Sequence, residues 1–298
     1  MSDELQNDRL AITPKRRGMI RHVGLSFAGI VATGVLASST KASAAAFTDA
    51  DLFNFALNFE YLGANYYLQA VTGKGLDAYA SIAGTGTPGN VVGGSPVPFK
   101  TPALAYYAQQ LANDELAHAL FLRDVLGAAA ITQPAVDLAD SWTVLALAAG
   151  LISPGQTFNP FQDEVNFLLG AYAIEDVCVT GLTGAAALLT SPTNIAYAAS
   201  LLGAEGYHGG AIRGFLSDIG AGVATNAISS LRATLSGVGD NGTSADGNPF
   251  NITNVDFNGQ AYRRTPSQVL SILYGSSVSG TASGLFFPSG VNGIINIV

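Results

Sequence analysis

The sequence has 298 residues, enough for one large domain or two small ones, and 48% of them are hydrophobic while only 11% are charged. This composition excludes a disordered chain, and a formal net charge of −8 argues against nucleic acid as a partner. The single cysteine, Cys178, excludes an internal disulfide and a cysteine zinc site. We expect Cys178 to be a small, buried hydrophobic side chain.

Residues 1–46 are predicted to be an export signal peptide outside the fold. A basic stretch containing Arg16 and Arg17 precedes an apolar run over residues 23–36, and an A-x-A cleavage site ends at Ala44. The paired arginines resemble a twin-arginine signal, which implies export of a protein that is already folded, often with its metal bound. We therefore expect a periplasmic, secreted or cell-envelope protein. The apolar run is too short for a stable membrane span, although an uncleaved N-terminal anchor stays open.

Four long apolar segments after the signal carry helix start and stop residues. Thr101-Pro102 and Ser191-Pro192 are typical helix starts, and Gly127 is a typical helix end. Each segment is apolar on more than one stripe, which favours a bundle with a heavily buried interior. The predicted helices cover residues 48–73, 101–127, 159–189 and 191–220.

The remaining segments are predicted to connect or extend this bundle. Residues 74–100 are rich in Gly and Pro and are expected to lie over one end of the bundle. Residues 128–158 form a long crossover with a short helix near 140–150. Residues 221–298 are read as a C-terminal extension packed on the bundle of residues 47–220, because they show no second hydrophobic core. The extension is expected to contain a helix over 226–235 and a short one after Pro266.

Without residues 1–44 the chain keeps seven Lys and Arg against 18 Asp and Glu, a net charge of about −11, and only two histidines. Both histidines lie three residues after a glutamate, in the motifs Glu115-Leu-Ala-His118 and Glu205-Gly-Tyr-His208. Five scattered glutamates would produce this pair by chance about 0.04% of the time. Residues i and i+3 of a helix lie about 60° apart and about 4.5 Å along it, so both side chains can reach one ion.

Two further glutamates lie mid-helix among apolar residues, so the order along the chain is Glu, Glu-x-x-His, Glu, Glu-x-x-His. This order matches the pattern already described for di-iron and di-manganese carboxylate bundles. Four buried carboxylates would repel one another, and two divalent ions would cancel their charge. Hard oxygen ligands with one nitrogen per ion favour Fe or Mn, with Zn as an alternative. The predicted ligands of two divalent metal ions are Glu60, Glu115, His118, Glu175, Glu205 and His208.

Several segments, among them "FNFALNFEYLGANYYL", "AYAIEDVCVTG", "GAEGYHGGAIRGFL" and "YRRTPSQVLSILYG", resemble the ferritin-like family that includes the plant desiccation-related proteins. The resemblance covers nearly the whole mature chain. It implies an all-α fold, a ferritin-like antiparallel four-helix bundle, with the same six ligands. The sequence departs from the family at Gly63 and Asn65, where members often have further glutamates, so functions that need extra carboxylates are put in doubt.

Three other residues near the predicted site are interpreted separately. Ferritins commonly keep a tyrosine near the metals, and Tyr67 either takes that place or is an ordinary aromatic residue of the bundle. Glu164 lies three helical turns from Glu175, so it is not expected to share the ions. Asp163 and Glu164 are instead expected to complement a helix N-terminus.

Two classes of function fit this reading. The first is redox chemistry on O2, peroxide or Fe(II), in either a catalase-like or a ferroxidase-like version. The second is a non-catalytic envelope protein for stress or desiccation, in which the metal pair only stabilises the bundle. The sequence leaves a homo-oligomer open and does not decide whether the protein is an enzyme.

Overall fold

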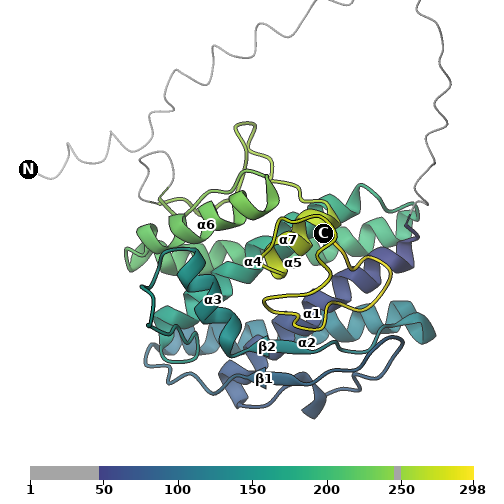
Figure 1. Ribbon diagram of the computed structural model, residues 1–298, viewed down its shortest axis with the longest axis horizontal. Helices are drawn as coiled ribbons and strands as arrows, with labels where there is room; N and C mark the ends of the chain where they lie inside the picture. The colour runs from purple at the N-terminus through teal and green to yellow at the C-terminus, as the bar shows by residue number, and fades with distance from the viewer. Residues whose placement is uncertain (1–46, 245–249) are drawn as a thin grey trace, which may run out of the picture. The chain divides into compact units, whose positions relative to one another are not determined.

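The computed structural model describes residues 47–244 and 250–298, and these residues form an all-α bundle, as predicted (Figure 1). The predicted signal peptide, residues 1–46, lies outside the described residues. Four long helices build the bundle, and α1 packs against α2 as α4 packs against α5. Their bounds are α1 Asp49–Thr72, α2 Pro102–Leu126, α4 Glu164–Ala186 and α5 Pro192–Asp218.

Local residues set the ends of these helices. Thr48 and Asp51 form a capping box before α1, and Gly73 ends the helix in the left-handed conformation with φ 71°. The Ser191 side chain accepts a hydrogen bond from the Asn194 N–H at the start of α5. The expected start of α4 near residue 159 was wrong. The helix begins at Glu164 because the preceding Asp163 accepts from the Asn166 N–H and so caps it.

The helix directions follow from contacts between their ends. At one end of the bundle, the Asp49 carboxylate accepts hydrogen bonds from the backbone N–H groups of Thr190 and Ser191, so α1 and α5 begin together. At the other end, the Glu164 carboxylate accepts from the N–H groups of Lys100 and Thr101, so α2 and α4 begin together. Since α2 and α4 run in the same direction, the chain between them must cross the full length of the bundle.

That crossover contains β2 (Val136–Leu138) and the expected short helix, α3 (Asp140–Ala148). β2 pairs in parallel with β1 (Val91–Gly93) of the connection between α1 and α2, with Val91 opposite Val136. The expectation that residues 74–100 lie over one end of the bundle was wrong. The connection runs back along α1 instead. Its residue Thr85 forms an isolated β-bridge with Ile131, and the Ile131 N–H donates a hydrogen bond to Asn54 in the first turns of α1.

Residues after α5 form α6 (Gly222–Ser236) and α7 (Pro266–Leu273), and both helices pack against α4. Their apolar side chains, including Ile228 and Leu270, join the same hydrophobic core as the four long helices. The last residues of the chain lie against α1, where Asn292 and Asn58 exchange hydrogen bonds of 2.9 and 3.0 Å. The boundary between bundle and extension stays a prediction.

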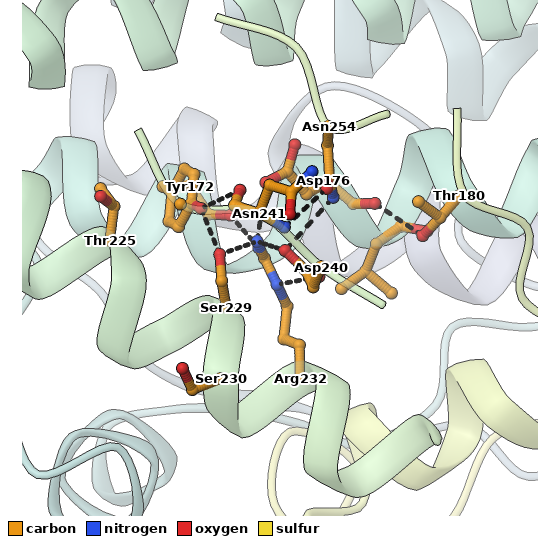
Figure 2. A network of polar contacts seen from close by, with 12 residues as sticks. Tyr172, Asp176, Thr180, Thr225, Ser229, Ser230, Arg232, Asp240, Asn241 and Asn254 are labelled. Atoms are coloured by element: carbon orange, nitrogen blue, oxygen red, sulfur yellow. Dashed lines mark hydrogen bonds and ion pairs between the residues drawn. The ribbon is translucent and has the colours of Figure 1, made fainter. Parts of the chain in front are cut away.

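A buried network of ion pairs also ties these later residues to the bundle (Figure 2). Asp176 of α4 accepts from Arg213 of α5 at 2.8 Å and from Arg232 of α6 at 2.7 Å. Asp240 bridges Arg232 and Arg264, each at 2.8 Å. The charges are paired at short distances, so breaking one partner would leave an uncompensated buried charge. This network holds α4, α5 and α6 together next to Glu175, the neighbour of Asp176 in the chain.

Among the described residues, α4 is long and apolar enough to cross a membrane, by length and composition alone. Its apolar stretch is 72% buried in the bundle. Its hydrophobicity is therefore explained by its place in the core, where Phe167 and Leu168 are almost fully buried.

Candidate metal centre

The structure brings all six predicted ligands together in the interior of the bundle. Glu60 comes from α1, Glu115 and His118 from α2, Glu175 from α4, and Glu205 and His208 from α5. Five of these side chains are at most 5% exposed, and the sixth, His118, is 12% exposed. Four separate helices therefore place these side chains at one level of the bundle, and their role as metal ligands stays a prediction.

The ligand atoms form two overlapping groups, each with all its atoms within 4.8 Å of one another. Glu60 and His118 belong only to the first group, whereas Glu175 and His208 belong only to the second. Glu115 and Glu205 belong to both groups, so their carboxylates lie where they would bridge two ions. Each ion would then receive one histidine nitrogen and up to three carboxylate oxygens.

The inner atoms of the cluster face one another without forming hydrogen bonds. The Nδ1 atom of His118 lies 3.0 Å from Glu205 Oε1 and 3.6 Å from Glu60 Oε2, and the Nδ1 atom of His208 lies 3.5 Å from Glu115 Oε1. None of these buried atoms has a hydrogen-bond partner. Buried polar groups in proteins are normally satisfied, so seven unsatisfied atoms pointing at two common centres fit two divalent cations.

Two contacts outside the cluster orient its ligands. The Nε2 atom of His208 lies 3.2 Å from Asp114 Oδ2, which leaves Nδ1 turned toward the cluster. Such a carboxylate contact to the outer ring nitrogen is typical of metal-binding histidines. On the opposite side, the buried Tyr67 hydroxyl donates a hydrogen bond to Glu175 Oε1. Tyr67 is therefore a neighbour of the cluster rather than an ordinary aromatic residue of the core.

The metal-free cluster holds protons that its residues would lose on binding metal. Burial raises the pKa of Glu60 to about 8, and burial together with repulsion from Glu205 and Glu115 raises the pKa of Glu175 well above its usual range. Burial opposes a charged His208, yet its contacts with Glu115 and Glu205 raise its pKa to about 12. The raised values mean that these groups carry protons near neutral pH when no ion is present.

Metal affinity is therefore expected to rise with pH. A cation must displace these protons, so affinity should increase about tenfold per pH unit for each proton released, and it should weaken toward acid pH. Isothermal titration calorimetry with Mn²⁺ between pH 6 and 8, in buffers of different ionisation enthalpy, measures both the slope and the protons released. A pH-independent affinity without proton release would contradict the assignment of these groups as ligands.

Gly63 and Asn65, where the resemblance implies further glutamates, each have a structural role. A Cβ atom at Gly63 would overlap the Oε2 atom of Glu115, so a side chain fits there only if that carboxylate moves away. Asn65 is buried, donates to the Tyr61 carbonyl and Gln133, and accepts from the Leu76 N–H at 2.9 Å. Asn65 thus anchors the connection between α1 and α2.

The substitution Gly63→Ala is expected to weaken metal binding at least about tenfold, because it displaces a carboxylate shared by both groups. The overlap is with the mobile end of Glu115, so the melting temperature of the metal-free protein should change little. Gly203→Ala is the matched control, since a Cβ there meets nothing within 4 Å. It should leave affinity unchanged and stabilise α5 by about 0.4–1 kcal/mol. Equal metal affinities of the two variants would disprove the argument.

Asp114 was not identified from the sequence, although a carboxylate next to Glu115 in a charge-poor chain was a usable signal. We expect Asp114→Asn to weaken binding of metal about tenfold, the lower end of the range for such outer contacts, because Asp114 is partly exposed. Asp124→Asn, also on α2 and exposed, is the control. Titration with Mn²⁺ checks both, and a normal affinity in Asp114→Asn would show that His208 needs no outer partner.

The remaining expectations near the site are partly revised. Glu164 does not reach the cluster, as expected, but it contacts the start of α2 while Asp163 caps its own helix. Cys178 is half-buried rather than fully buried, and it belongs to neither ligand group. Asp176 and its arginine partners were also missed, because only tertiary structure brings α4, α5 and α6 together.

These features define a helical bundle that carries a buried carboxylate and histidine cluster suited to metal ions. Residues 48–218 match the family model of the ferritin-like domain, so the chain belongs to the ferritin-like family. It is 27% identical over 270 residues to the ferritin-like catalase Nec2 of Nesocodon mauritianus, covering 83% of this chain and 84% of that protein. It is 31% identical over 245 residues to the desiccation-related protein PCC13-62 of Craterostigma plantagineum, covering 75% and 76% respectively. No solved structure matches the chain.

Proposed function

We propose that this chain is an exported protein that holds two Fe or Mn ions and disproportionates hydrogen peroxide, as part of protection against stress or desiccation. The observation that carries the proposal is the pair of overlapping ligand groups that share Glu115 and Glu205. A relative named as a ferritin-like catalase supports peroxide as the substrate. Oxidation of Fe(II) by O2 is the other redox version of the same site.

Two bound ions would supply the electron transfers by which one peroxide molecule is reduced to two water molecules while a second is oxidised to O2. The protein residues have other tasks. Glu115 and Glu205 would hold the ions close together, and His118 and His208 would each bind one ion as a neutral ligand. The buried Tyr67 hydroxyl fixes Glu175, and the surrounding apolar residues limit the access of bulk water.

The alternative is a structural metal pair in a protein without catalytic activity. The relative named as a desiccation-related protein favours this alternative, since its name states no reaction. In that case the ions would neutralise buried carboxylates and stabilise the bundle, and peroxide would not be consumed.

Measurement of peroxide consumption separates the two functions. Protein loaded with Mn²⁺ or Fe²⁺ is expected to consume hydrogen peroxide and release one O2 for every two peroxide molecules, followed with an oxygen electrode. Asp218→Ala, an exposed carboxylate on α5, should keep this activity, and Glu205→Ala should lose it. Rates equal to those of the free metal ions would support the structural alternative.

A further inference from the structure

Two small hollows lie between α1 and α4, and they share the side chains of Phe59 and Cys178. Both side chains are half-buried, so they stand between the interior and the surface. We call this region, bounded by Phe59, Leu62, Cys178 and Leu182, the α1–α4 seam. Leu273 of α7 also lines one of the hollows, so the C-terminal residues contribute to its wall.

Both hollows end at predicted metal ligands. One is lined by Glu115 and Glu175, and the other is lined by Glu60. Gly63 lies in the wall of the first, beside Glu115, and its lack of a side chain helps to leave this space free. The seam therefore joins the partly exposed residues Phe59 and Cys178 to both halves of the ligand cluster.

The size and polarity of the hollows limit what can pass. Each has a volume of about 10 Å³, close to the minimum for one water-sized molecule. Apart from the ligands, the walls are apolar, so a hydrated ion would lose its water without compensation. Phe59 packs edge-on against the buried Phe55, with ring centroids 4.6 Å apart, which holds its ring in the seam.

We propose that the α1–α4 seam is the path by which water-sized, uncharged molecules reach the cluster, and that Phe59 excludes larger peroxides. This inference rests on the proposed function for its substrate, hydrogen peroxide, but the path itself does not depend on turnover. The other face of the cluster is polar and more exposed to solvent, because the side chain of His118 is 12% exposed there and that of Asp114 is 38% exposed. That polar face is the competing path.

The first test compares the reduction of hydrogen peroxide with that of tert-butyl hydroperoxide in the metal-loaded protein. Ascorbate is added to both reactions to supply the two electrons and two protons that convert tert-butyl hydroperoxide into tert-butanol and water. Phe59→Ala is expected to raise the kcat/KM for tert-butyl hydroperoxide relative to hydrogen peroxide by about tenfold or more, a barrier change of about 1.4 kcal/mol. The matched control is Phe121→Ala. This residue is half-buried on α2, one turn after His118, and packs on Tyr197. The control should leave the ratio within about twofold. An unchanged ratio in Phe59→Ala, or a larger change in the control than in Phe59→Ala, would overturn the role of Phe59.

The second test uses the single cysteine as a plug and a probe. Methyl methanethiosulfonate converts the Cys178 thiol into a methyl disulfide and releases methanesulfinate. The added methylthio group would take up space beside the hollows that Cys178 lines. This modification is expected to lower hydrogen peroxide turnover about tenfold without loss of metal, and dithiothreitol should restore turnover. Cys178→Ala, treated in the same way, should not respond. Full turnover in the modified protein would disprove the seam as the path.

The labelling rates themselves test the path without any turnover. In the metal-loaded wild type, the methyl reagent should label Cys178 at least about tenfold faster than a benzyl reagent, and Phe59→Ala should remove most of that difference. If labelling follows this rule while no variant consumes peroxide, the seam stands and the proposed function fails. If the bulky reagent labels the wild type as fast as the methyl reagent, the seam does not select by size, and the inference is wrong.

Discussion

Replacement of Glu205 by alanine is expected to remove both metal ions, whereas replacement of Glu175 is expected to leave one ion bound. The reason is geometric. Glu205 Oε1 lies 3.0 Å from the Nδ1 atom of His118, and Glu205 Oε2 lies 3.7 Å from that of His208, so this carboxylate serves both ligand groups. Glu175 belongs to one group only. Loss of an outer contact to a ligand costs about 10–100-fold in affinity, so loss of a shared ligand should cost more.

Elemental analysis after gel filtration measures the number of metal ions per chain in the Glu205→Ala and Glu175→Ala variants. The control is Asp218→Ala, which removes an exposed carboxylate from the same helix as Glu205 and should keep the wild-type metal content. A Glu205→Ala variant that retains one tightly bound ion would refute the shared role, and a Glu175→Ala variant without metal would show that the two ions bind only as a unit.

Removal of the metals by a chelator is expected to lower the melting temperature by roughly 10–20 °C. A ligand that binds only the native state at about 100 times its Kd contributes about 2.7 kcal/mol, and two ions double this contribution. For a chain of this size each kcal/mol corresponds to about 2–4 °C. The structural reason is that the metal-free core retains four buried carboxylates, of which Glu60 and Glu175 have raised pKa values that reflect the free-energy cost of their charged forms.

Differential scanning calorimetry with and without a chelator checks this effect. Glu205→Ala supplies the control, because a variant without bound metal should melt at the same temperature in both conditions. A wild-type melting temperature that does not respond to the chelator would mean that the ions add nothing to the native state. The result also bears on the alternative function, since a large stabilisation without peroxide turnover favours a structural metal pair.

Much of the candidate metal cluster could be read from the sequence because the information is local. A glutamate and a histidine three residues apart share a helix face, and this relation depends only on helix geometry. The scarcity of charge made Glu60 and Glu175 conspicuous in apolar helices. Helix ends were likewise predicted where capping residues stood next to the helix, as at Thr48 and Ser191. The start of α4 was misjudged because Asp163 was treated as a residue within the helix rather than its cap.

The features that decide how the site works depend on residues far apart in the chain. The relative positions of α2 and α5 place two carboxylates in both groups of the cluster. They also bring Asp114 next to the ring of His208. The α1–α4 seam exists only where two helices about 110 residues apart approach each other around Gly63. The helix faces that carry the glutamates and histidines could be read from the sequence, because helix periodicity is local. The overlap of the two groups at Glu115 and Glu205, and the hollows of the α1–α4 seam, became visible only in the fold, because both arise from packing between helices.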